Sequence, residues 1–441
     1  MKKIDLTILG GGWAGLLCAL LSRNKNSEIT INVFEKNGYG ERGGLLRSEV
    51  ESGFTFDIGG PHILFSRNRI ILEKIVSILG KNVRQHERKA IVRYKGQNVP
   101  YPFENGIYTL KPEERVILGS DLIKAMINSA GNPDWTPKTF EDWIFGYFGN
   151  SIARDYLLPY NQKIWKQEPS NMDADWVYSP GRLPFPEVDE IVRSIAGLPS
   201  IGYKEQATFY YPKWGGIQAL YDSLLEKVTK NDIEVIFGTE IRSCRKEQDS
   251  WLINGNFRSS NIISTLPLRT INGVFDLSNE VASSVSKLTY NKDIVVGVAL
   301  KVPTPDYNIM YVPQSDVSFH RLTWMSSLIP VDSPDQSNLI AETTIPQNDS
   351  MGNRNIINET ISGLIKLGII KSESEVIFSK QWVNELAYPI YTKGHEKFRF
   401  NAISYLNNMG IKSVGRWGSW HYWNTDKVYE AVENLVNMQE L

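Results

Sequence analysis

The stretch of sequence that decides the fold is IDLTILGGGWAGLLCALLSRNKNSEITINVFEK, residues 4–36. Its first apolar run leads into Gly10-x-Gly12-x-x-Gly15, a segment of helical length follows, and a second β-type run ends at Glu35. The order strand, glycine turn, helix, strand predicts a β-α-β unit. We therefore expect a parallel sheet at the start of the chain.

The glycine triplet has the spacing of a dinucleotide-binding turn. Gly10 would permit the tight turn, Gly12 would let the backbone approach a pyrophosphate, and Gly15 would let helix and strand pack closely. The helix N-terminus would attract the phosphates, and Glu35 would accept the ribose hydroxyls. A plain glycine turn is the alternative, but the flanking strands and the terminal acid favour a dinucleotide site. The cofactor-binding residues predicted in this segment are Gly10, Gly12, Trp13, Ala14, Gly15, Glu35 and Lys36.

Three further glycine-containing elements indicate which dinucleotide binds. They are a second loop after Glu35, a loop within GFTFDIGGPHILF, and a glycine-arginine pair before the C-terminal helix. A nicotinamide dinucleotide needs no such additions, whereas an extended FAD molecule needs further backbone contacts along its length. Each element could also be an ordinary turn, but their combination favours FAD. The cofactor-binding residues predicted here are Gly43, Gly44, Leu45, Gly59, Gly60, Pro61, His62, Gly415, Arg416, Tyr422, Asn424 and Thr425.

The composition excludes several classes of protein. The 441 residues carry 48 basic and 49 acidic side chains, so a nucleic-acid partner or a diffuse attraction to anionic membranes is not expected. No apolar run of about 18 residues occurs, which predicts the absence of a membrane span. Only Cys18 and Cys244 are present, too few for a metal cluster, and no metal is expected. A signal segment is not recognisable either, so we expect a cytoplasmic protein.

The pattern of apolar residues changes along the chain and predicts an α/β protein with interleaved domains. Spacing of helical period dominates 110–176, and alternating β-type runs fill 292–345. We expect a discontinuous Rossmann-type FAD-binding domain, an inserted helical substrate-binding domain and a mainly antiparallel β-sheet domain. Their predicted ranges are 1–80, 205–266 and 405–441 for the first, 104–180 for the second, and 81–103, 181–204 and 267–404 for the third.

Later motifs carry a resemblance to a known family. They are GGPHILFSRN (59–68), YNQKIW (160–165), WVYSPGRLPFP (176–186), ATFYYPKWGG (207–216), Tyr311 with Arg321 ten residues later, Tyr388-Pro389-Ile390, and GRWGSWHYWNTD (415–426). With the glycine elements they resemble the FAD-dependent amine oxidase and protoporphyrinogen oxidase superfamily, and within it the UDP-galactopyranose mutase family. The glycine elements fit the whole superfamily, whereas the arginines and tyrosines are particular to the mutases.

The resemblance implies a set of site residues. Arginine suits a diphosphate because its planar fork makes two-pronged contacts. By resemblance, Arg182 and Arg321 would stabilise the diphosphate, and His62 would lie beside the flavin. Phe65 and Tyr101 are additional aromatic candidates. The substrate-binding residues implied are Tyr160, Trp165, Tyr311, Tyr388, Tyr422, Gln206 and Asn424, although mutases of the eukaryotic type have an asparagine where Gln206 stands.

The implied activity is the interconversion of the pyranose and furanose forms of UDP-galactose, or of a related nucleotide hexose. In such mutases N5 of reduced FAD attacks the anomeric carbon to give a sugar-flavin adduct, and no net redox occurs. NAD(P)H is one conceivable reductant. An FAD-dependent oxidoreductase of the amine oxidase or protoporphyrinogen oxidase type is the main alternative, and a non-catalytic flavin-binding protein is the third. The sequence leaves open the sugar and whether the chain forms a homo-oligomer.

Overall fold

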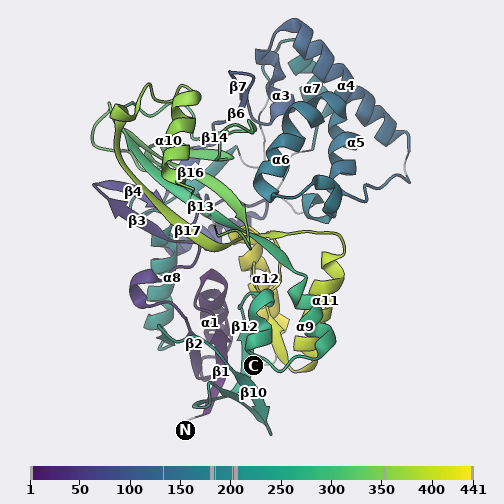
Figure 1. The fold of residues 1–441 in the computed structure, drawn as a ribbon. Helices are drawn as coiled ribbons and strands as arrows, with labels where there is room; N and C mark the ends of the chain where they lie inside the picture. Colours follow the sequence, from purple (N-terminus) through teal and green to yellow (C-terminus); the bar gives the residue numbers. More distant parts are fainter. Residues whose placement is uncertain are drawn as a thin grey trace.

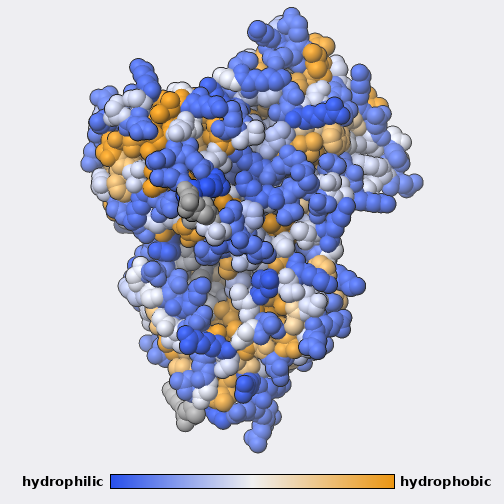
Figure 2. All heavy atoms as spheres, viewed as in Figure 1, coloured by the Kyte–Doolittle hydropathy of each residue, from blue (hydrophilic) through white to orange (hydrophobic). Residues whose placement is uncertain are grey.

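The computed structural model describes residues 3–132, 134–178, 183, 185–200, 202, 207–350 and 354–438. Figure 1 shows a lower lobe that contains both ends of the chain, and above it a twisted sheet beside a group of helices. Figure 2 shows polar and charged residues over most of this face, with apolar residues in separate patches. No helix of the described residues is long and apolar enough to cross a membrane.

The lower lobe is built on the predicted β-α-β unit. β1 (Lys3–Leu9) and β2 (Ile31–Phe34) are parallel neighbours, joined by α1 (Trp13–Lys25). β12 (Phe257–Ser264) pairs with the other edge of β1 in parallel, which confirms that this late segment re-enters the first sheet. The strand order is β10-β11-β12-β1-β2-β9, with β18 beside β12. The remaining strands are β9 (Glu234–Ile236), β10 (Cys244–Glu247), β11 (Ser250–Ile253) and β18 (Ile411–Ser413).

Helices cover this sheet because each buries an apolar stripe against it. α12 and α8 both contact α1, and α2 contacts α8 and α12. Their apolar residues form one core with β1 and β2. The bounds are α2 (Arg69–Leu79), α8 (Gln218–Lys230) and α12 (Thr425–Met438).

The upper sheet has the order β17-β13-β16-β15-β14-β6-β7. Neighbouring strands are antiparallel except for β14 and β6. One face packs on α10 (Ile356–Lys366) and the other on a hairpin of β3 (Ser48–Glu51) and β4 (Phe54–Asp57). The strands are β6 (Ala90–Tyr94), β7 (Gln97–Pro100), β13 (Thr289–Leu300), β14 (Ile309–Tyr311), β15 (Arg321–Trp324), β16 (Ser337–Pro346) and β17 (Val376–Ile390).

The helical unit lies beside this sheet and holds an aromatic core that includes Trp143 and Trp165. Thr139 and Asp142 cap the start of α5 reciprocally, which fixes where that helix begins. A π-helical segment, η3 (Ala153–Leu157), connects α5 to α6. The helices are α3 (Phe103–Gly106), α4 (Pro112–Ala130), α5 (Phe140–Ile152), α6 (Leu158–Trp165) and α7 (Val188–Ile195). The structure thus confirms the predicted α/β fold class.

Parts of the predicted domain ranges differ from the structure. Residues 181–204 were expected in the sheet domain, but they contain α7, which packs on α3 and α4 through the buried Ile191. Residues 267–404 likewise contribute α9 (Asn279–Ser286) and most of α11 (His395–Asn408) to the lower lobe, where their apolar faces pack against the first sheet. In both cases an amphipathic helix joins the nearest apolar surface rather than the sheet that continues its chain.

Candidate functional site

The first glycine loop leaves open space where phosphates would bind. Gly10 has φ +100°, and a Cβ on Gly15 would lie 1.9 Å from the Gly10 carbonyl oxygen, so helix and loop are in direct backbone contact. α1 begins just after Gly12, which caps the helix without a side-chain hydrogen bond. A Cβ on Gly12 would meet nothing within 4 Å. The helix N-terminus therefore faces space suited to an anion.

The Glu35 carboxylate is held at the end of β2. The Gly11 N–H donates to Oε2 and the Asn37 N–H donates to Oε1, each at 2.9 Å. Lys36, also predicted in this site, is exposed. The loop itself thus orients the carboxylate beside the Gly10–Gly15 turn, where a ribose would lie.

The second glycine loop packs closely against the third. A Cβ on Gly59 would lie 2.0 Å from the carbonyl oxygen of Leu45, which explains why glycine is required there. A Cβ on Gly44 would meet nothing within 4 Å. Like Gly12, Gly44 therefore has open space beside its backbone.

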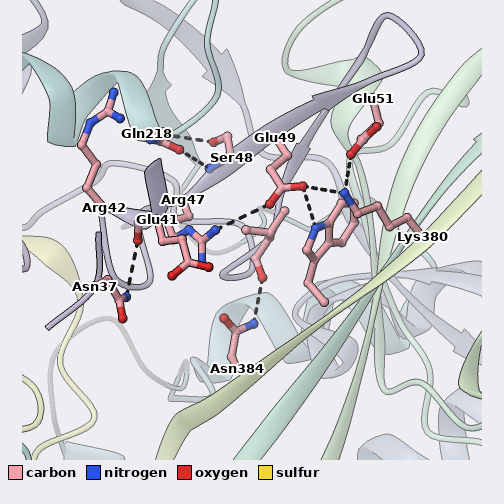
Figure 3. Close-up of polar contacts among 12 residues, drawn as sticks. Asn37, Glu41, Arg42, Arg47, Ser48, Glu49, Glu51, Gln218, Lys380 and Asn384 are labelled. Atoms are coloured by element: carbon pink, nitrogen blue, oxygen red, sulfur yellow. Dashed lines mark hydrogen bonds and ion pairs between the residues drawn. The ribbon is translucent and has the colours of Figure 1, made fainter. Parts of the chain in front are cut away.

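Polar contacts anchor the second loop to α8, as Figure 3 shows in part. The Arg42 guanidinium pairs with the Asp222 carboxylate at 2.8 and 3.1 Å. The Ser48 N–H donates to Gln218 Oε1 at 3.0 Å, and Arg47 lies 3.6 Å from Glu49. The basic side chains of this loop are therefore engaged by protein carboxylates, and it is the backbone that faces the open space.

A second set of contacts in Figure 3 ties the β3–β4 hairpin to β17. Trp382 Nε1 and Lys380 Nζ donate to Glu49 Oε2 at 2.8 and 2.9 Å, and Lys380 also pairs with Glu51. Asn384 Nδ2 donates to the Ile58 carbonyl oxygen at 2.8 Å. The residue before Gly59 is therefore held by the upper sheet.

The glycine-arginine pair lies next to the first loop. Gly415 has φ +98°, and a Cβ there would lie 2.7 Å from the Ala14 Cβ. The Arg416 guanidinium packs over the Tyr422 ring at 4.5 Å and donates to the Ala387 carbonyl oxygen at 2.5 Å. Its Nε is buried and has no hydrogen-bond partner among the described residues. The predicted glycine elements thus converge, because the loop before α12 meets the start of α1.

A cavity opens beside these loops, between the helical unit and the upper sheet. It offers about 200 Å³ of space to water-sized molecules. Trp13 Nε1, which donates to the Thr425 carbonyl oxygen at 3.1 Å, links its edge to the start of α1. The predicted site residues that line it are Pro61, His62, Tyr160, Trp165, Tyr311, Arg321, Tyr422, Asn424 and Thr425, with the candidates Phe65 and Tyr101.

His62 has its tautomer set by the preceding turn. Its Nδ1 lies 2.8 Å from the Gly60 carbonyl oxygen. Because a carbonyl only accepts hydrogen bonds, Nδ1 is the donor in this contact.

Arg321 is engaged by a carboxylate that the sequence did not reveal as part of the site. Arg321 lies opposite Tyr311 in the β14–β15 register, and its Nε and Nη2 donate to Glu342 at 2.5 and 2.6 Å. The Glu342 side chain is 1% exposed and also accepts from the Tyr388 hydroxyl at 3.2 Å. Glu342 Oε1 would lie 3.1 Å from a Cβ on Gly60. Much of the Arg321 charge is therefore balanced within the protein.

Asp293 adds a second buried carboxyl to this cluster. Burial raises its pKa well above the usual range, and the neighbouring Glu342 charge raises it further. His320, the residue before Arg321, is kept neutral because burial and then the Arg321 charge lower its pKa.

Two further residues of the cavity wall were missed by the sequence analysis. Arg88 Nη2 donates to the Tyr311 hydroxyl at 2.7 Å, while Arg88 Nε and Nη1 are buried and have no partner among the described residues. Glu104 is 4% exposed, and its Oε1 is likewise buried without a partner in that part of the chain. In the sequence, Arg88 lies in a charged stretch that is typical of an exposed turn. Glu104 has the position of an ordinary acidic residue in the first turn of a helix. Only their burial distinguishes them.

Other predicted residues are placed differently or lie outside the description. Trp165 is 1% exposed, its Nε1 donates to Asn161 Oδ1 at 3.1 Å, and it packs on Trp176, so only its edge reaches the cavity. Tyr388 is buried behind Arg321, with its hydroxyl directed at Glu342. Arg182 and Gln206 lie outside the described residues.

The fold combines a Rossmann-like lobe with an added helical unit and an antiparallel sheet. Residues 8–76 match the NAD(P)-binding Rossmann-like domain family. A crystal structure of reduced UDP-galactopyranose mutase has a TM-score of 0.86 to this chain at 24% identity, over 99% of this chain and 94% of that one. A protoporphyrinogen oxidase homologue from Exiguobacterium has a TM-score of 0.75 at 17% identity, over 99% and 98% of the two chains. The resemblance inferred from the sequence is thus confirmed for the fold.

A curated relative adds a sequence match. The dTDP-fucopyranose mutase of Escherichia coli is 23% identical over 211 residues, which are 46% of this chain and 52% of that protein. The chain thus spans about half the length of the curated relative that it matches. Both named mutases resemble this chain, one in fold throughout and one in sequence over part of its length.

Proposed function

We propose that this chain is a flavin-dependent nucleotide-sugar mutase. It would interconvert the pyranose and furanose forms of a UDP-hexose, with UDP-galactose as the first candidate, without net redox change. The observation that carries the proposal is the cavity itself. Arg88 and Arg321 flank Tyr311 on one wall, beside His62 and next to the converging glycine loops.

The loops fit an extended FAD molecule. Gly12 and Gly44 leave open space beside the backbone, α1 starts without a side-chain cap, and the Glu35 carboxylate is held in place. Phosphates would lie against the α1 N-terminus and a ribose against Glu35. When bound and reduced, the flavin would supply the nucleophile for the anomeric carbon. The cavity edge at His62, Asn424 and Thr425 would then adjoin the flavin ring.

The wall residues fit a diphosphate leaving group. Negative charge grows on the diphosphate as the anomeric bond breaks, and preorganised cations stabilise that charge. Among the described residues, Arg88 Nε and Nη1 have no hydrogen-bond partner, whereas Glu342 occupies two donors of Arg321. Arg88 would therefore make the stronger contact with the diphosphate, and the Tyr311 hydroxyl would be aligned by its bond from Arg88. Arg182 stays a proposed partner of this group.

The surroundings of the cavity also favour a polar ligand over the apolar substrates of many oxidases. The Arg88 guanidinium on the wall would be costly to cover with an apolar molecule, because its charge would lose water without compensation. The alternative of an FAD-dependent oxidoreductase is nevertheless directly testable, since it predicts consumption of an electron acceptor.

The experiment is to incubate the protein with UDP-galactopyranose and separate the products by chromatography, in parallel samples with dithionite, with NAD(P)H and in air. The proposal expects a furanose product only in reduced samples, without stoichiometric loss of the reductant. A panel with dTDP-hexoses tests the nucleotide. Oxygen uptake with peroxide in proportion to product would instead establish an oxidase, and absence of conversion by fully reduced, flavin-loaded protein would overturn the mutase proposal.

A further inference from the structure

Glu104 differs from two other buried carboxylates of the described residues, Asp57 and Glu342. Asp57 accepts from the Tyr211 hydroxyl, the Ser48 hydroxyl and the Ile217 N–H at 2.6, 2.7 and 3.1 Å. Glu342 is bound by Arg321. Glu104, in contrast, lines the cavity with Oε1 buried and without a partner among the described residues. A buried polar atom of this kind, at the wall of a cavity, is a candidate for contact with a ligand.

Aromatic side chains lie close to Glu104 on the cavity wall. Tyr156 packs between Phe103 and Tyr160, with ring centroids at 5.0 and 5.9 Å. The Glu104 carboxyl is near enough to Tyr156 to raise the pKa of that phenol, after the larger effect of burial. Aromatic side chains recognise planar ligands by offset stacking or edge contacts. The base is the planar part of a nucleotide sugar, and we therefore assign it to this end of the cavity.

The chemical form of the carboxyl decides what it can pair with. Burial raises the pKa of Glu104 to about 7, an effect only partly opposed by its own backbone N–H. Near neutrality the neutral acid is therefore well populated, and it carries one donor and one acceptor side by side. Uracil and thymine, the bases in the names of the two mutases above, both present a ring N–H next to a carbonyl.

We propose that Glu104 makes recognition of the ligand's base depend on protonation. As a neutral acid its O–H donates to a base carbonyl and its C=O accepts from the adjacent ring N–H, whereas the carboxylate would set an oxygen against that carbonyl. This inference rests on the proposed function, since it takes the ligand to be a uridine or thymidine diphosphate sugar. It makes Glu104 a specificity-determining residue.

The other ionisable groups around Glu104 come from several elements. They are Tyr156 of η3, Tyr101 before α3, Glu190 of α7, which accepts from the Ser200 hydroxyl at 2.5 Å, and Arg88 and Tyr160 on the cavity wall. Phenols and guanidinium groups do not change charge between about pH 6 and 8. His62 is a further ionisable residue of the cavity lining. A variant that changes only Glu104 separates its contribution from that of His62.

The test measures binding of UDP to the flavin-loaded protein by calorimetry, for the parent, Glu104→Gln and Glu104→Leu. If only the neutral acid binds the base, the parent Kd rises roughly tenfold from about pH 6 to about pH 8, relative to Glu104→Gln. Glutamine is the matched control because its amide offers a donor and an acceptor at every pH. Glu104→Leu should lower the affinity for UDP at least tenfold at the lower pH. The affinity for inorganic pyrophosphate should be the same in all three proteins.

The outcomes separate this inference from the proposed function. If UDP binds but the parent and Glu104→Gln show the same pH profile, or Glu104→Leu binds as tightly as the parent, the role of Glu104 is overturned while the mutase proposal stands. If Glu104→Leu lowers the affinity for pyrophosphate as strongly as the affinity for UDP, Glu104 does not contact the base. If neither UDP nor pyrophosphate binds the parent, the proposed function itself fails.

Discussion

The first glycine loop and the cavity wall are two regions built on opposite principles. In the loop, Gly10, Gly12 and Gly15 lie within six consecutive positions, and the contacts are made by their own backbone. In the wall, Arg88 and Arg321 come from segments more than 230 positions apart and act through side chains. A site made by the backbone is therefore determined by a few consecutive residues, whereas a site made by side chains depends on which distant residues the fold brings together. The experiments below are designed to break or refine that contrast.

The largest effect is expected in the loop, where two glycines differ only in what surrounds them. Gly15→Ala would drive a Cβ to 1.9 Å from the Gly10 carbonyl oxygen, and that backbone cannot move without separating α1 from β1. We expect a clear fall in Tm and loss of bound flavin, since overpacking of this severity exceeds the usual cost of about 1 to 3 kcal/mol. Calorimetry and the flavin released on denaturation measure both.

Gly12→Ala is the matched control, because its Cβ meets nothing within 4 Å. The fold should melt within a few degrees of the parent, while flavin binds more weakly since the methyl group occupies the space of the phosphates. Equal flavin content in Gly12→Ala and the parent would show that the cofactor does not approach this loop.

The next effect concerns the arginine that is engaged within the wall. Arg321→Leu leaves the Glu342 carboxylate buried without its guanidinium partner. Breaking a buried pair costs about 3 to 5 kcal/mol, and a value near 3 is expected because the Arg321 side chain is 22% exposed. Urea unfolding measures this loss. The double variant Arg321→Leu/Glu342→Leu should recover much of it, and a double variant no more stable than Arg321→Leu would contradict the pairing as the cause.

The contrast between these regions also marks what sequence could predict. The β-α-β unit, the β6–β7 hairpin, the return of β12 and β18 to the first sheet, and the convergence of the glycine elements follow from local patterns. The placement of α7 does not, because an amphipathic helix can bury its stripe against either neighbour. Nor does the Arg321–Glu342 pair, since 21 residues and a strand register separate the partners. Glu104 gave no signal at all, because an acidic residue at a helix start is ordinary.

Arg88 tests whether an unengaged arginine of the wall behaves differently from Arg321. Arg88→Ala removes two unspent donors and leaves no buried carboxylate partner behind, so its unfolding free energy should change little. Affinity for UDP and kcat/KM should instead fall by about 2 to 4 kcal/mol, roughly 30- to 1,000-fold. Arg88→Lys should recover part of the loss.

Arg84, exposed on β5 (Arg84–Glu87), supplies the control. Arg84→Ala should be nearly silent in UDP binding and in unfolding, which excludes a general effect of net charge. If Arg88→Ala unfolded as easily as Arg321→Leu while binding UDP like the parent, the two arginines would have exchanged the roles assigned to them.

The smallest effect is a dependence of stability on pH that belongs to Glu104 alone. Burial raises its pKa to about 7 from an ordinary value of 4.5, so between these values the folded protein binds more protons than the unfolded chain. Its contribution to stability is therefore complete below the ordinary value and is lost as the pH rises through about 7.

Compared with Glu104→Gln, the parent should lose about 2 kcal/mol of unfolding free energy from about pH 5 to about pH 7. Urea titrations at several pH values measure the difference. Glu113→Gln, an exposed first-turn residue of α4, should show no such difference. A parent-minus-Glu104→Gln difference that stays constant with pH would mean that Glu104 is ionised in the fold, and the protonation-dependent contact with a base would lose its physical basis.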